Sequence, residues 1–142
     1  MDYYVLRMVS RELQCVGHMP LLGVNDALRR INPALDWILT ESSVWLRPPD
    51  IQHARKRHED DFYSFFNDLP RLVEHPEHVE LSGTKEHRIS LVSCIRRAGE
   101  EYWVLTGLQL CSLDPCPGQN YLVTFYEVGR GKCHEANFAP VR

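Results

Sequence analysis

The second half of the chain contains three segments rich in β-branched and aromatic residues, separated by turn-forming residues. This composition is typical of β-strands. The glycine of RAGE (97–100) favours a tight hairpin after the first segment, and the prolines and glycine of CSLDPCPGQN (111–120) favour a longer loop after the second. The predicted strands are Arg88 to Arg96, Tyr102 to Cys111 and Tyr121 to Val128.

Apolar residues of the first half recur at helical spacing in GVNDALRRINPALDWIL (23–39). They are Leu28, Ile31, Leu35, Ile38 and Leu39. We expect Asn25 or Asp26 to cap this helix and Pro33 to kink it or divide it in two. Trp37, within the same segment, is predicted to join the core, with ligand stacking as the alternative.

Three shorter elements are also expected. Asp50 follows two prolines and is suited to cap a helix. Pro70 is suited to open a short helix that ends before Pro76. The segment Tyr3 to Val9 has the composition of an edge strand.

Helices followed by strands indicate an α+β fold rather than an alternating α/β fold. We expect one domain over residues 1–142, with N-terminal helices packed on a small twisted antiparallel β-sheet formed by the C-terminal half. The candidates for the helix-packed core are Ile89, Leu91, Ile95, Val104, Leu108, Leu122 and Tyr126.

Composition narrows the class of protein. Apolar residues make up 44% of the 142 residues and charged residues 25%, which are ordinary values for a globular domain. No apolar run approaches the roughly 18 residues that cross a bilayer, and the first residues lack the pattern of a signal peptide. We therefore expect a cytoplasmic protein with no membrane partner. The net charge of −3 argues against a protein that simply coats nucleic acid.

The five cysteines are odd in number and include no CxxC pair, so a disulfide framework is not expected. A zinc site is the alternative, but the ligand spacing is not that of a standard zinc motif. Its ligands would be Cys111, Cys116, Cys133 and His134. We predict no metal and no cofactor.

The segment DIQHARKRHED (50–60) carries the candidate chemistry. On a helix, one side would carry Ile51, Ala54, Arg55 and His58, and the other His53 and Arg57. Histidine exchanges a proton near neutral pH, and a guanidinium binds phosphate through two hydrogen bonds. Either histidine is alternatively an ordinary surface or core-edge residue. Thr124 or Thr106, on predicted strands, would add a hydroxyl or simply pack, and strand alternation predicts that Thr124 faces with Leu122 and Tyr126.

HARKRH, LPRLVEHPEHVELS, RISLV, WVLTG and LVTFYEV, in this order, resemble the phage-associated branch of the barnase–EndoU–colicin–RelE nuclease superfamily. The resemblance spans residues 47–132, preceded by an N-terminal helical extension (1–46). It implies a toxin or mobile-element-associated endoribonuclease that cleaves RNA, such as tRNA or mRNA, by 2′-hydroxyl attack without metal. It also implies an inhibitor or immunity protein as a partner.

The resemblance assigns roles to residues of this chain. His53 and His58 would be the acid and base, in either order, Arg57 the phosphate ligand and Thr124 the strand hydroxyl. The expected substrate-binding residues are Arg55, Lys56, Thr106, Arg130 and Lys132, of which Arg130 and Lys132 are alternative sources of the cation. A non-catalytic binding module of the same fold, serving as an adaptor, inhibitor or immunity factor, is the competing hypothesis. Convergence of the four catalytic candidates in one cleft would favour catalysis.

Overall fold

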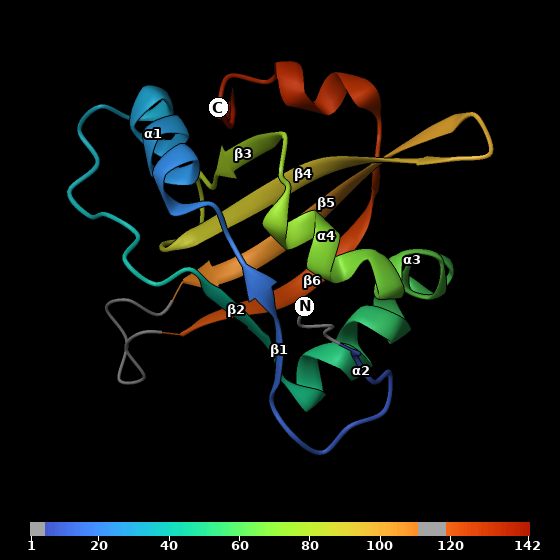
Figure 1. Cartoon of the computed structure of the whole chain (residues 1–142). Coiled ribbons are helices and arrows are strands. Elements are labelled where there is room, and N and C mark those ends of the chain that lie inside the picture. Colours follow the sequence, from blue (N-terminus) through green and yellow to red (C-terminus); the bar gives the residue numbers. More distant parts are fainter. Residues whose placement is uncertain (1–4, 111–118) are drawn as a thin grey trace.

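A seven-stranded mixed β-sheet runs through the residues that the computed structural model describes, 5–110 and 119–142 (Figure 1). The strands lie in the order β1-β2-β6-β5-β4-β3-β7. Their bounds are Gln14–His18 (β1), Ser43–Leu46 (β2), His78–Leu81 (β3), Arg88–Arg97 (β4), Glu100–Leu110 (β5), Asn120–Val128 (β6) and Phe138–Pro140 (β7). The α+β class is confirmed, and the three predicted strands are β4, β5 and β6.

The strands β4, β5 and β6 form the antiparallel centre of the sheet. The predicted hairpin joins β4 to β5, and its Ala98 and Gly99 have φ angles of 50° and 80°. Positive φ at both central residues is the conformation of a type I′ turn, whose twist matches that of the strands. The predicted loop 111–120 falls largely outside the described residues.

The outer edge of β6 is only partly covered by another strand. β2 pairs with β6 in parallel at Asn120 and Tyr121 alone. Further along, the helices α2 (Pro48–Arg57) and α3 (Glu59–Phe65) lie against β6 instead. The Asp61 carboxylate accepts a hydrogen bond from the backbone N–H of Glu127 at 3.1 Å. The two helices therefore cover the edge that β2 leaves open.

The helices bury one face of the sheet. α1 (Leu21–Ile31) and α4 (Leu69–Glu74) complete this layer, together with the 3-10 segment η1 (Phe66–Asp68). Their apolar side chains form one continuous core with that face. The sheet residues predicted for this core and confirmed in it are Ile89, Leu91, Ile95, Val104, Leu108 and Leu122. None of the described helices is long and apolar enough to cross a membrane.

A β-bulge in β6 changes which of its side chains face the helices. Leu108 pairs with Leu122, but Gly107 pairs with Thr124, so Val123 is the extra residue. Leu122 therefore faces the helical core, whereas Thr124 and Tyr126 face the opposite side. The prediction that Leu122 shares a face with Thr124 and Tyr126 is wrong, since simple alternation does not survive a bulge.

Tyr126 was also predicted in the helix-packed core, and this is wrong for the same reason. It belongs to a smaller apolar cluster on the opposite face, with Leu105 and Phe138. The 3-10 segment η2 (Arg130–His134) contributes Cys133 to this second cluster.

The N-terminal half contains strands as well as helices, so the sheet is not formed by the second half alone. β1 and β2 pair antiparallel, whereas β2 and β6 are parallel, which makes the sheet mixed rather than fully antiparallel. The predicted strand at Tyr3 to Val9 is wrong for Val5 to Val9, which form no strand, and Tyr3 and Tyr4 lie outside the described residues. Short, partly polar strands of this kind carry little sequence signal.

The predicted helix boundaries need two corrections. α1 begins at Leu21, before Asn25 and Asp26, and ends before Pro33, so Leu35 and Ile38 are not helical. α2 begins at Pro48 with Arg47 as N-cap, so Asp50 lies inside the first turn rather than at the cap. Proline fits the first turn because its missing N–H would be unpaired there in any case. The short helix predicted at Pro70 is confirmed as α4, and it ends at Glu74.

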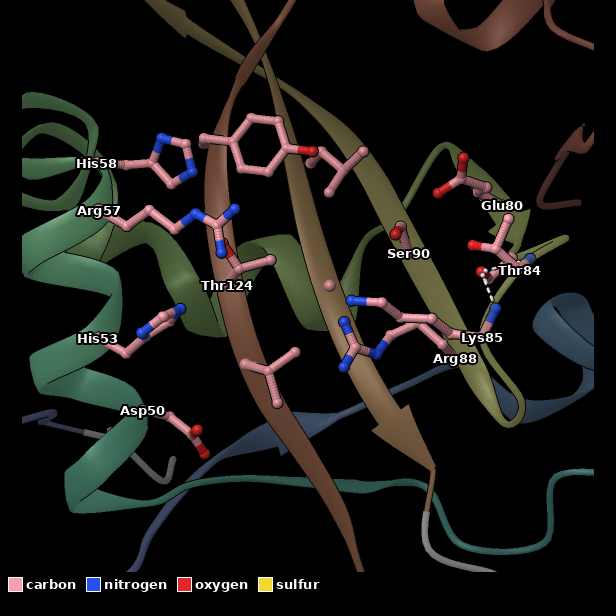
Figure 2. Close-up of a pocket in the computed structure, with 15 residues that line it drawn as sticks. Asp50, His53, Arg57, His58, Glu80, Thr84, Lys85, Arg88, Ser90 and Thr124 are labelled. Carbon is pink, nitrogen blue, oxygen red and sulfur yellow. Dashed lines mark hydrogen bonds between the residues drawn. The ribbon is translucent and has the colours of Figure 1, made fainter.

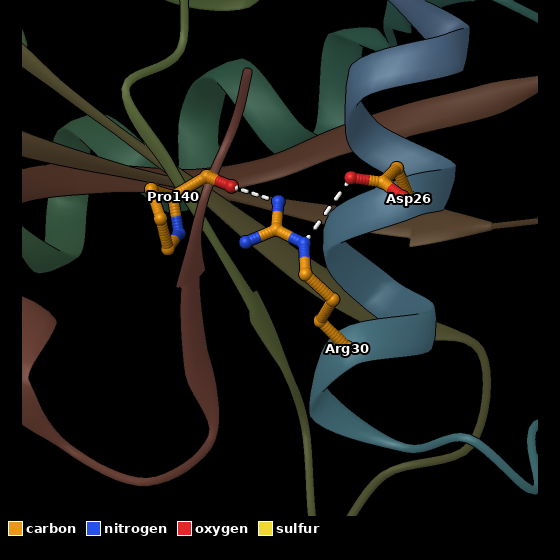
Figure 3. A network of polar contacts seen from close by, with 3 residues as sticks. All are labelled: Asp26, Arg30 and Pro140. Atoms are coloured by element: carbon orange, nitrogen blue, oxygen red, sulfur yellow. Dashed lines mark hydrogen bonds and ion pairs between the residues drawn. The ribbon is translucent and has the colours of Figure 1, made fainter.

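The first helix is tied to the last strand by Arg30 (Figure 3). Its guanidinium donates hydrogen bonds to the backbone carbonyl of Pro140 in β7 and to the Asp26 carboxylate one turn earlier, the latter at 3.1 Å. α1 is thereby fixed across the β3–β7 edge of the sheet.

A second contact fixes the segment that follows α1. The Asn25 side chain donates a hydrogen bond to the backbone carbonyl of Leu39 at 2.8 Å and accepts one from the Leu39 N–H at 2.9 Å. A single amide group thus satisfies both backbone groups of a buried residue.

Replacing Asn25 with Ala leaves both Leu39 backbone groups without these partners. We expect the free energy of unfolding to fall by about 2 kcal/mol, because unsatisfied buried polar groups are costly. Urea denaturation followed by circular dichroism measures the loss. Asp26→Ala is the control, because its exposed ion pair is worth at most about 0.5 kcal/mol. Equal losses in the two variants would contradict the assignment.

Candidate functional site

A pocket of about 730 Å³ lies on the face of the sheet opposite the helical core (Figure 2). Its floor is formed by β5 and β6, and its two sides by α2 and by the region around the β3–β4 turn. The lining residues are Asp50, His53, Arg57, His58, Glu80, Ser82, Thr84, Lys85, Arg88, Ser90, Leu105, Gly107, Val123, Thr124 and Tyr126. All four predicted catalytic residues are among them.

One side of the pocket is a polar stripe of α2. Asp50, His53 and Arg57 are separated by three and four residues, so they lie on one face of the helix. Ile51 and Ala54, on another face, are buried in the core. In Figure 2 the side chains of His53 and Arg57 point from α2 toward β6, the strand that carries Thr124. The helix that covers the edge of β6 therefore presents its polar residues to the open face of the sheet.

His58 reaches the same pocket because α2 ends at Arg57. His58 is the junction between α2 and α3, with φ −138° and ψ 63°, which are not helical angles. Its ring stacks on Tyr126 with 4.7 Å between the centroids and 26° between the planes. The prediction that His58 lies on the opposite side of the helix from His53 and Arg57 is therefore wrong. The helix break brings all three to one cavity.

The other side of the pocket carries two cations that sequence reasoning missed. Lys85, in the β3–β4 turn, and Arg88, at the start of β4, extend toward α2 (Figure 2). Arg88 Nε donates a hydrogen bond to Oε1 of Gln109 at 3.3 Å. The Ser82 hydroxyl accepts hydrogen bonds from the backbone N–H groups of Thr84 and Lys85. Lys85 and Arg88 carried little signal in the sequence, because only the pairing of the strands brings the β3–β4 turn opposite α2.

The pocket carries more available positive than negative charge. Of its two acids, Asp50 is paired with the Arg47 guanidinium at 2.7 Å. Glu80 accepts a hydrogen bond from the neutral amide of Asn137 at 2.9 Å and keeps its negative charge. Within the described ranges, the lining cations Arg57, Lys85 and Arg88 form no ion pair. This balance favours an anionic ligand.

Gly107 opens the floor of the pocket. A Cβ atom at this position would lie 2.8 Å from Cγ2 of Thr124, so no other residue fits without displacing its cross-strand neighbour. The glycine therefore leaves space above β5 next to Thr124.

The predicted substrate-binding residues lie elsewhere. Thr106 is fully buried on the helix-packed face, where its hydroxyl has no hydrogen-bond partner among the described residues. The Arg55 guanidinium lies 5.7 Å from the ring centre of Phe62, and Lys56 is exposed outside the pocket.

Arg130 and Lys132, the alternative cations, belong to η2 and do not line the pocket either. A hydrogen bond to Glu135 raises the pKa of Lys132 and holds its ammonium group. The cations opposite Arg57 are instead Lys85 and Arg88.

No group of three or more metal-ligating side chains occurs within residues 5–110 and 119–142. Two members of the alternative zinc set, Cys111 and Cys116, lie outside these ranges. The other two, Cys133 and His134, are adjacent in η2.

Comparison with known proteins gives no match: no family model, no curated protein and no solved structure is similar to this chain at a significant level. The residues of the pocket are therefore the main guide to function.

Replacing Gly107 with Ala tests the packing of the floor. We expect the free energy of unfolding to fall by about 1–3 kcal/mol, because the added methyl group forces Thr124 to move. Chemical denaturation measures the change. Gly131→Ala is the control, since a Cβ there meets no atom within 4 Å. If Gly107→Ala were as stable as the parent, the close contact with Thr124 would be refuted.

Proposed function

We propose that the chain is an endoribonuclease that cleaves RNA by attack of a 2′-hydroxyl group on the adjacent phosphodiester. The observation that carries this proposal is the position of Arg57 in the pocket. Its side chain extends from α2 with His53 on one side and His58 on the other, in the pocket that Thr124 also lines, and Lys85 and Arg88 extend toward it across the floor (Figure 2). A phosphate bound at Arg57 would therefore have an imidazole on each side.

This arrangement supplies the groups that the reaction needs. One histidine removes the proton of the 2′-hydroxyl, and the 2′-oxygen attacks phosphorus. The bond between phosphorus and the 5′-oxygen breaks as the other histidine donates its proton to that oxygen. The products are a 2′,3′-cyclic phosphate and a free 5′-hydroxyl.

The remaining pocket residues stabilise the negative charge of the phosphate and orient the reacting groups. Arg57 binds the phosphate oxygens, and Lys85 and Arg88 add positive charge where the pentacoordinate phosphorus develops negative charge. The Thr124 hydroxyl donates a neutral hydrogen bond to the same group. Stacking on Tyr126 restricts the ring of His58, so this histidine is oriented before substrate binds.

On the basis of the resemblance to phage-associated nucleases, we extend the proposal to a biological role and a partner protein. A toxin or mobile-element-associated nuclease acts on cellular RNA in the cytoplasm and needs an inhibitor or immunity protein. An acidic partner that covers Arg57, Lys85 and Arg88 would block the pocket, because the cations attract it in place of the substrate.

The test is incubation with a mixed RNA pool in EDTA, followed by analysis of fragment ends. We expect 2′,3′-cyclic phosphate or 3′-phosphate ends. His53→Ala and His58→Ala should each lower the cleavage rate about 100- to 10,000-fold, the usual worth of one general acid or base. Arg57→Ala should lose a comparable amount through weaker phosphate stabilisation, and Thr124→Val less, because it removes one neutral hydrogen bond while keeping the side-chain shape.

Two controls make the result specific. Arg29→Ala removes one positive charge from an exposed position on α1 and should cleave as the parent does. An oligonucleotide with a 2′-deoxyribose at the cleavage position should stay intact, because it lacks the nucleophile. If folded His53 and His58 variants cut as fast as the parent, or if the parent leaves RNA intact, the catalytic proposal fails. The alternative, a non-catalytic protein-binding module that serves as an adaptor, inhibitor or immunity factor, would then take its place.

A further inference from the structure

A second pocket, of about 390 Å³, lies beside the first and shares residues with it. Ser82, Thr84 and Lys85 line both cavities. The β3–β4 turn is therefore a common boundary, and a chain-like ligand that leaves the first pocket across this turn enters the second.

The second pocket contains an aromatic side chain that is available for stacking. Trp37, in the segment between α1 and β2, packs against the helical core with part of its surface, as predicted. It is partly exposed in the pocket and contacts the ring of His87 edge-on, with 5.9 Å between centroids. Its indole N–H donates to no acceptor among the described residues, whereas Trp45 donates to Ser43 at 3.0 Å. A ligand in this pocket therefore meets both an indole ring and a free hydrogen-bond donor.

The backbone around the second pocket is held in an unusual conformation. His87 has a φ angle of 52°, which is uncommon for a residue other than glycine and costs conformational energy. Its carbonyl accepts a hydrogen bond from the Leu110 N–H at 2.7 Å. The sheet thus fixes the His87 backbone while its ring packs against Trp37.

Charge distinguishes the two pockets. The first pocket contains Arg57 and Arg88, which form no ion pair among the described residues, and Lys85. The second contains the carboxylates of Asp36 and Glu86, and its only lysine or arginine in the described part of the chain is Lys85, which both pockets share. Two carboxylates disfavour a phosphate. They suit the exocyclic amino groups of a nucleobase, which are hydrogen-bond donors.

We infer that the pocket at Trp37 is a subsite for a nucleobase of single-stranded RNA, one that stacks on the indole while a phosphate several nucleotides along the same strand occupies the pocket at Arg57. This inference rests on the proposed ribonuclease function for the identity of the ligand. It assigns a substrate-positioning role to the N-terminal segment, outside the region that resembles the nucleases.

The test measures binding of fluorescently labelled 2′-O-methyl oligonucleotides, two to eight nucleotides long, by anisotropy. These probes keep the RNA backbone but lack the free nucleophile. Trp37→Ala should weaken binding of the longer probes roughly 5- to 150-fold, the usual worth of one stacked base. The shortest probe, held by its phosphate alone, should bind Trp37→Ala and the parent equally. Trp37→Phe, which keeps a stacking surface, should recover most of the affinity.

Tyr63→Ala is the matched control, because Tyr63 is an exposed aromatic residue on α3 outside both pockets. Melting temperatures must show that each variant is folded. If RNA is cleaved normally but Trp37→Ala binds every length as the parent does, the subsite is refuted and the ribonuclease proposal stands. If the Trp37 penalty appears with length but the parent cleaves no RNA, the subsite stands and catalysis is refuted.

Discussion

The short parallel pairing between β2 and β6 is the constraint on which the candidate site depends. Two residues of β6 are paired in this way, and the rest of its outer edge needs another cover. α2 and α3 supply that cover. The Asp61 carboxylate accepts a hydrogen bond from the Glu127 N–H, which would otherwise bond a neighbouring strand. An amphipathic helix beside a sheet edge reaches both faces of the sheet. The buried side chains of α2 thus join the core while its polar stripe reaches the open face.

Three local irregularities then assemble the cavity on that face. The helix break at His58 rotates a histidine out of the helical pattern, and the bulge at Val123 turns Thr124 to the face opposite Leu122. Gly107 removes the side chain that would fill the floor. None of these features stabilises regular secondary structure. Together they leave a positively charged hollow over an otherwise well-packed sheet.

The sequence predicts the parts of the fold that depend on local preference. The central strands and the hairpin at Ala98 and Gly99 follow from β-branched residues and turn chemistry. β1 and β2 escaped prediction because they are short and partly polar, and only pairing in the folded chain makes them strands. The sequence singled out His53, Arg57 and Thr124 by residue type, spacing and the resemblance to nucleases, and all three line the pocket. Lys85 and Arg88 were missed because their approach to α2 is set by the order of strands.

The hydrogen bond from Arg30 to Pro140 joins residues 110 positions apart. Contacts of such long sequence separation form late, since loop closure must precede any gain from them. During synthesis, the free edge of β3 must wait for residues 138–140 to leave the ribosome, and α1, which also packs on β3, gains the rest of its docking surface only then. The nascent chain therefore stays unfinished at this edge while the strands that carry the pocket have already been made. We therefore expect the sheet to form from its centre outward, with the first helix among the last parts to reach its final position.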